Sequence, residues 1–171
     1  MALEATGNNL SKEALIAQVQ ETVDQNDYTI VDTDLGRPWG GFYRLDNGDA
    51  ERFAAQYFPE VEFETFEGLS PKFLLVAPGE QLSWQLHNRR AELWRVLEGP
   101  VGVKLSNTDE QPSEVRTLQP GESIQFDTEV RHRLIGLTGI WGLVAEIWQH
   151  TDPANPSDED DIIRLEDNYG R

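Results

Sequence analysis

From Val61 onward the chain consists of short β-rich runs separated by turn residues, and this pattern restricts the fold more than any other feature of the sequence. The turns contain Gly, Pro or Asn, as at Pro78-Gly79 and Pro120-Gly121. The runs cover residues 61–66, 72–77, 82–87, 92–97, 101–106, 114–118, 123–126, 132–135 and 140–150. Many short strands at regular spacing are typical of an antiparallel sandwich or barrel. The sequence therefore predicts an all-β fold from residue 61 onward.

The N-terminal part of the sequence has a mainly helical pattern instead. Ser11 is a plausible helix N-cap, and Leu15, Val19 and Val23 follow it at helical spacing. A strand is expected at 28–31 and a second short helix at 49–58, because the apolar residues of the latter fall on one helical face. We expect a helix-and-strand extension over residues 1–34 and one β domain over residues 35–171.

The charge balance excludes several classes of function. The chain has 14 basic and 31 acidic residues, for a formal net charge of −17, and it has no cysteine. A chain this acidic repels phosphate backbones and anionic lipid, so we expect neither nucleic-acid nor membrane partners. The absence of cysteine excludes disulfides, a thiolate nucleophile and thiolate-bound metal. The first residues lack a basic, apolar leader and no stretch is long enough to span a bilayer, so a cytoplasmic location is expected.

Two of the three histidines lie where a strand pattern would bring them near a carboxylate. Side chains alternate along a strand, so Gln85 and His87 share one face, and a hairpin after His87 would return Glu92 to that face. His132 opens another β-rich run. Two imidazoles, a carboxylate and an amide oxygen suit a divalent metal such as zinc, iron, nickel or copper, although an isolated strand histidine is usually a surface or satisfied polar group.

The spacing of these residues resembles the two sequence motifs of the cupins. Gly79 opens a segment that contains Gln85-x-His87 and Glu92 and ends at Gly99, and Gly121 opens a second segment that contains His132. In cupins the corresponding residues bind a metal inside a jelly-roll barrel. The resemblance implies a cupin jelly roll with Gln85, His87, Glu92 and His132 as metal ligands.

The stretch from Leu82 to Trp94 resembles one cupin family, the type II phosphomannose isomerases. These cupins also form the C-terminal domain of bifunctional mannose-1-phosphate guanylyltransferases, and small stand-alone cupins of this type are often described as sugar-phosphate or phosphoheptose isomerases. Further matches lie at 37–40, 76–79, 132–134 and 159–171, so the resemblance covers about residues 35–171. Arg89 and Leu93 stand where the family has histidines, and we expect them to alter substrate contacts.

The resemblance implies a metal-dependent aldose–ketose isomerase acting on a sugar phosphate, either mannose 6-phosphate/fructose 6-phosphate-like or a heptose phosphate. The expected cofactor is zinc, with manganese, cobalt, nickel or iron as alternatives. Lys72 and Glu146 are the candidates for the base that moves the proton. Four arginines in the matching motifs are candidates for binding the phosphate: Arg90, Arg133, Arg164 and Arg171.

Two other functions fit the same residues. Two histidines and a carboxylate also form the facial triad of iron-dependent oxygenases. The cupin would otherwise be a non-catalytic module that binds a sugar or nucleotide-sugar. Small jelly rolls often pair through edge strands, so a homodimer is possible, with a small-molecule sugar phosphate as the expected partner.

Overall fold

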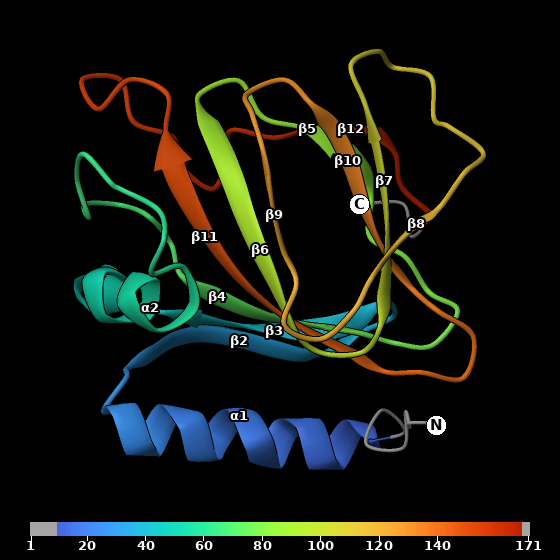
Figure 1. The fold of residues 1–171 in the computed structure, drawn as a ribbon, viewed down its shortest axis with the longest axis horizontal. Helices are drawn as coiled ribbons and strands as arrows, with labels where there is room; N and C mark the ends of the chain where they lie inside the picture. Colours follow the sequence, from blue (N-terminus) through green and yellow to red (C-terminus); the bar gives the residue numbers. More distant parts are fainter. Residues whose placement is uncertain (1–9, 169–171) are drawn as a thin grey trace.

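Two antiparallel sheets make up most of the computed structural model, which describes residues 10–168 (Figure 1). The larger sheet has the strand order β2 (Ile30–Arg37), β3 (Gly40–Leu45), β4 (Lys72–Val76), β11 (Gly142–His150), β6 (Arg90–Glu98) and β9 (Ser123–Phe126). The smaller sheet has the order β12 (Ile163–Glu166), β5 (Trp84–Leu86), β10 (Arg131–Gly136), β7 (Val101–Ser106) and β8 (Arg116–Leu118). This arrangement is the jelly roll that the sequence predicts.

The N-terminal helix α1 (Lys12–Asn26) begins where its capping residue predicts. The Ser11 hydroxyl accepts a hydrogen bond from the Ala14 amide, which satisfies one of the unpaired donors of the first turn. The helix ends at Asp27 in the left-handed conformation. A single 3₁₀ turn, η2 (Asn47–Asp49), leads into the second helix, α2 (Ala50–Tyr57).

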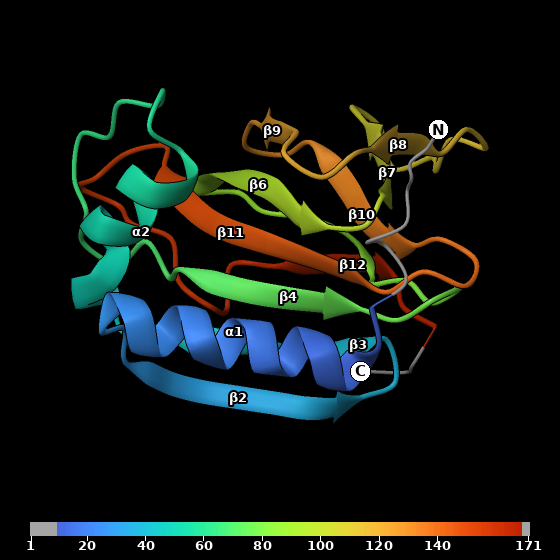
Figure 2. The same ribbon diagram turned by 60° about the horizontal axis from the view of Figure 1, so that its bottom comes forward.

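Side-chain alternation in the larger sheet divides the apolar core into two clusters. In β4, Phe73 and Leu75 pack with the buried faces of α1 and α2, which cover the outer side of the sheet (Figure 2). Leu74 and Val76 point the other way, into the barrel, where they join the second cluster. Burying each such side chain stabilises the fold by about 1.5–3 kcal/mol. One end of the barrel is therefore filled with apolar side chains, and the polar residues inside the barrel lie outside this apolar cluster.

The structure corrects several expected elements. Residues 61–66 form no strand; Phe63 and Phe66 instead stack on each other and pack against the helical core. Strands β3 and β12 were not expected. The strands β5 and β6 do not form a hairpin, because they belong to different sheets.

The boundary expected between residues 34 and 35 falls inside β2, and α1 shares a core with the sheet; a separable N-terminal extension stays a prediction. Within residues 10–168, no helix is both long and apolar enough to cross a membrane.

Candidate metal centre and cavity

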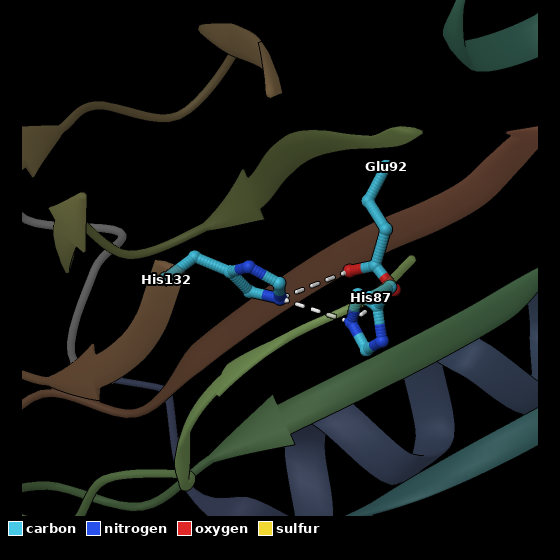
Figure 3. Close-up of side chains that lie close together, drawn as sticks. All are labelled: His87, Glu92 and His132. Atoms are coloured by element: carbon cyan, nitrogen blue, oxygen red, sulfur yellow. Dashed lines mark hydrogen bonds and ion pairs between the residues drawn. The ribbon is translucent and has the colours of Figure 1, made fainter. Parts of the chain in front are cut away.

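Three buried side chains from the two sheets converge at one point inside the barrel (Figure 3). His87 follows β5, Glu92 lies in β6 and His132 lies in β10. The Nε2 atoms of the two histidines are 3.2 Å apart, and Glu92 Oε2 is 3.0 Å from His87 Nε2. Glu92 Oε1 is 3.5 Å from His132 Nε2. Each of the three side chains is at most 2% exposed, so the cluster is shielded from bulk water.

Backbone carbonyls orient both imidazoles toward the centre of this cluster. The Nδ1 atom of His87 lies 2.7 Å from the Asp161 carbonyl, and that of His132 lies 3.0 Å from the Val130 carbonyl. A carbonyl can only accept, so each Nδ1 carries the proton and each Nε2 presents its lone pair inward. This is the tautomer that a metal-binding histidine needs.

The carboxylate of Glu92 leaves one oxygen available to a cation. Oε2 accepts a hydrogen bond of 2.9 Å from Arg90 Nε, while the buried Oε1 has no hydrogen-bond partner among the described residues. Burial raises the pKa of Glu92, but its contacts with His87 and the cationic Arg90, together with that with His132, outweigh burial and hold that pKa well below its usual range. An ionised carboxylate with an unpaired buried oxygen beside two imidazole lone pairs fits a divalent cation.

Gln85 lies at the edge of the cluster. It is the register partner of His132 across β5 and β10, and its amide nitrogen is 3.3 Å from His132 Nε2. The amide oxygen accepts a hydrogen bond from Ser83. Rotating the amide by half a turn exchanges these atoms, directs the oxygen at the centre and lets the amide nitrogen donate to the Ser83 hydroxyl. The side chain can thus supply a fourth ligand without moving its backbone.

A C-terminal strap, defined here as residues 157–161, holds this centre from outside. The Asp161 carboxylate accepts hydrogen bonds from the amides of Asn88 and Arg89, both 2.9 Å, and from the Ser157 hydroxyl at 2.6 Å. The guanidinium of Arg90 donates to Ser157 and to strap carbonyls, and it stacks 3.7 Å from the centre of the Trp148 ring. The strap therefore positions both His87 and the arginine that orients Glu92.

A cavity of about 380 Å³ opens beside the centre and contains both candidate bases. Lys72 and Glu146 are register partners on β4 and β11, with Lys72 Nζ 3.7 Å from the Glu146 carboxylate. The indole nitrogens of Trp94 and Trp148 donate to Glu146 at 2.9 and 3.3 Å. Burial, with a further contribution from the charge of Glu92, raises the pKa of Glu146 above its ordinary value even though Lys72 and Arg90 oppose the shift.

The four arginines expected to bind phosphate occupy different places. Arg164 lines the cavity, and so does Arg90, whose guanidinium is already committed to Glu92 and the strap. Arg133 lies outside the cavity lining; it is buried and donates to the Leu82 carbonyl, Gln111, Glu166 and Asn168. Arg171 lies outside the described residues. The structure thus brings Arg90 and Arg164 to the site and does not bring Arg133 there.

Sequence reasoning missed three residues at this site. Asp161 carries the strap contacts, and Glu159 pairs with Lys72 Nζ at 3.0 and 3.2 Å. Arg44 lines the cavity from β3. The match at 159–171 was a signal for the first two, although it did not say that the segment folds over the metal centre. Nothing in the sequence singled out Arg44, because β3 itself was not expected.

A family model described as the C-terminal domain of mannose-6-phosphate isomerase matches residues 24–167. The chain belongs to this family. The match places the cupin motifs, the strap and the cavity in one family domain, and it confirms the resemblance drawn from residues 82–94.

Curated relatives carry this domain within longer proteins. The chain is 32% identical over 135 residues to the mannose-1-phosphate guanylyltransferase ManC of Salmonella typhimurium, covering 79% of this chain and 22% of the relative. It is 31% identical to the xanthan biosynthesis protein XanB of Xanthomonas campestris, with 79% and 23% covered. It is 30% identical to the alginate biosynthesis protein AlgA of Pseudomonas putida, with 91% and 27% covered. The chain thus spans about a quarter of the length of these relatives.

Solved structures confirm the cupin-like fold. The capsular polysaccharide assembling protein CapF of Staphylococcus aureus superposes with a TM-score of 0.54 at 12% identity, covering 79% of this chain and 34% of that one. A recombinant oxalate oxidase superposes with a TM-score of 0.52 at 17% identity, covering 77% and 58%. At these identities the likeness shows the fold alone.

Proposed function

We propose that this cupin is a metal-dependent aldose–ketose isomerase acting on a phosphorylated sugar, of the mannose 6-phosphate/fructose 6-phosphate type or a heptose phosphate. One observation supports the proposal above the others. The buried carboxyl of Glu146 and the ammonium of Lys72 line the same cavity as Gln85 and Glu92 of the candidate metal centre. A proton-transfer group and a candidate cation site therefore face the same cavity.

The metal would be held by Gln85, His87, Glu92 and His132. Imidazole and carboxylate donors suit zinc, and manganese, cobalt, nickel and iron accept the same donors. A bound divalent ion supplies positive charge beside the substrate oxygens that become negative when the proton leaves. Phe126 and Trp94 pack on His132, with ring centres 4.2 and 5.6 Å away, so that this charge acts in a dry environment.

Glu146 is the residue we assign to the proton transfer. Isomerisation removes a proton from C2 of the aldose and returns it to C1, while the carbonyl moves from C1 to C2. A carboxylate whose pKa is raised by burial is a stronger base than an ordinary one. Lys72 is paired with Glu159 as an ammonium, so its role is to donate hydrogen bonds to substrate oxygens.

The two departures from the family pattern lie away from the cavity. Leu93 faces the outer core with the helices, and the Arg89 side chain donates to the Pro156 carbonyl and to Asp158. Neither residue lines the cavity. Their positions support a substrate similar to that of the family rather than a different one.

The test is a coupled isomerase assay over hexose and heptose phosphates, with zinc, manganese, cobalt or nickel added, run in parallel in deuterated water. We expect turnover of at least one sugar phosphate with deuterium entering the product at the carbon that receives the proton. Glu146→Gln should lower kcat by at least about 100-fold, the usual size of a general acid–base contribution. The control, Glu114→Gln, replaces an exposed glutamate outside the cavity and should retain wild-type turnover.

Two outcomes would contradict the isomerase, and a third would contradict the base assigned to it. Sugar-phosphate binding without turnover or deuterium exchange would indicate the non-catalytic binding module. Tight ferrous iron with oxygen uptake would indicate the oxygenase. Full activity of Glu146→Gln would remove the assigned base. A homodimer, a cytoplasmic location, and the absence of nucleic-acid and membrane partners stay predictions.

A further inference from the structure

A single row of charged side chains crosses the cavity floor, perpendicular to the strands. The register pairs Glu146 on β11 with Lys72 on β4, Lys72 with Arg44 on β3, and Arg44 with Asp32 on β2. All four residues line the same cavity. The next row toward the packed end of the barrel holds Leu74 and Val144, so the charged row is a boundary between a polar and an apolar region.

The positive members of this row are engaged to different degrees. Lys72 is only 12% exposed and is held by Glu159 and Glu146. Arg44 is 32% exposed, and its guanidinium lies 3.8 Å from the Asp32 carboxylate, beyond the roughly 3.2 Å of a normal N–H···O hydrogen bond. Asp32 is itself 53% exposed. The Arg44 ion pair is therefore loose and solvated, and an incoming anion can replace it at small cost.

The spacing of the strands sets the distance between Glu146 and Arg44 in this row. Neighbouring strands lie about 4.8 Å apart, so the backbone positions of Glu146 and Arg44 are separated by about 10 Å. An extended chain advances about 1.2 Å per bond, so the six bonds from C2 to phosphorus in an open-chain hexose 6-phosphate span about 7 Å. A contact of about 3 Å at each end, between Glu146 and C2 and between the guanidinium and the phosphoryl group, brings the total to about 13 Å, so the long Arg44 side chain would lean outward by about 3 Å to reach the phosphoryl group.

We propose that Arg44 binds the phosphoryl group of the substrate, at the end of the sugar remote from the carbonyl. This inference rests on the proposed function for its orientation, because Glu146 marks the end where C2 reacts. Lys72, in the middle of the row, then contacts the hydroxyl groups between the two ends. Asp32 competes with the phosphoryl group for Arg44.

Calorimetric titration tests the binding part without any turnover. Inorganic phosphate and mannose 6-phosphate are titrated into wild type, Arg44→Met, Arg44→Lys and Asp32→Asn, in the presence of a chelator so that no metal contributes. We expect Arg44→Met to weaken both ligands by about tenfold or more, since hydrogen bonds between charged groups contribute that much. Arg44→Lys should retain part of the affinity, and Asp32→Asn should raise it two- to threefold. Arg116→Met, at an exposed position of β8, is the matched control and should bind as wild type does.

Steady-state kinetics test whether Arg44 contributes to binding of the phosphorylated substrate. Arg44→Met should raise KM for hexose and heptose phosphates about tenfold with kcat nearly unchanged, and should leave any activity on unphosphorylated sugar as it is. Unchanged phosphate affinity in Arg44→Met and Arg44→Lys, both folded by circular dichroism, would overturn the inference even if the isomerase is real. If no isomerase activity exists but phosphate binding still depends on Arg44, the proposed function fails and the anion site stands.

Discussion

Replacing Asp161 by asparagine should destabilise the strap and the metal centre together. The carboxylate accepts three hydrogen bonds, one at Oδ1 from the Asn88 amide and two at Oδ2 from the Arg89 amide and the Ser157 hydroxyl. Asparagine has one acceptor oxygen, so at best two bonds survive as neutral ones and one backbone amide loses its partner. The part-buried amide that loses its partner costs about 1 kcal/mol, and the lost charge assistance costs about 1 kcal/mol for each of the two surviving bonds, for a total of about 3 kcal/mol.

Urea unfolding followed by fluorescence measures this loss. With a slope of about 2 kcal/mol per molar urea for a chain of this size, the midpoint of Asp161→Asn should fall by about 1.5 M at pH 7. Metal affinity, measured by competition with a chromophoric chelator, should fall by about 10- to 100-fold, because the Asp161 carbonyl orients His87. Asp158→Asn is the control: its side chain is 60% exposed, so the free energy of unfolding should change by under about 1 kcal/mol.

The pH dependence of the free energy of unfolding tests whether the ionised Asp161 carboxylate causes this loss of stability. Burial raises the pKa of Asp161, but the Ser157 hydroxyl and the two backbone amides outweigh it, so the pKa is lowered. A lowered folded-state pKa contributes stability that is present above the unfolded pKa, about 3.9, and is lost as the pH falls through the folded-state value. The difference in the free energy of unfolding between wild type and Asp161→Asn should therefore become smaller below about pH 4. An unchanged urea midpoint and unchanged metal affinity at pH 7 would refute the role assigned to the strap.

Three further predictions test other parts of the structure. The raised pKa of Glu146 means that its contribution to stability is full below the unfolded pKa, about 4.3, and is lost as the pH rises through the folded-state value, so Glu146→Gln should gain stability relative to wild type with rising pH in urea titrations. Leu75→Ala, at a fully buried position between the sheet and the helices, should cost about 2–5 kcal/mol of unfolding free energy; a smaller loss would indicate that α1 does not seal that core. Ser11→Ala should cost about 1 kcal/mol and lower helicity by circular dichroism, and an unaltered spectrum and midpoint would contradict the capping role.

Much of the fold follows from local patterns. The Ser11 cap and the spacing of Leu15, Val19 and Val23 predict α1, because a helix start depends on residues close in sequence. The β-rich runs from residue 72 onward correspond to strands for a similar reason. The run at 61–66 alternates like a strand but finds no partner strand, and its two phenylalanines are partly buried against the helical core from an irregular segment instead. Alternation indicates that one face of a segment can be buried. It does not show that a neighbouring strand is available for backbone hydrogen bonds.

The elements that were missed depend on partners remote in sequence. β12 alternates apolar and polar residues over only four positions, all of them exposed, and it forms because β5 offers an edge to pair with. The four candidate ligands were identified from spacing, and Glu92 does reach His87, but across the two sheets rather than through a hairpin. The roles of Asp161 and Arg44 were not predictable, because each depends on a contact with residues far along the chain.

The central claim is that His87, Glu92 and His132, joined by Gln85, bind one divalent cation. X-ray data from crystals of the purified protein, collected on both sides of the absorption edge of the bound metal, test it most directly. The account predicts one anomalous peak per chain, about 2.0–2.2 Å from the two Nε2 atoms and from a Glu92 oxygen, and its loss in His132→Ala. A peak ligated by other residues, or no peak after equilibration with zinc, manganese, cobalt, nickel and ferrous iron, would contradict it.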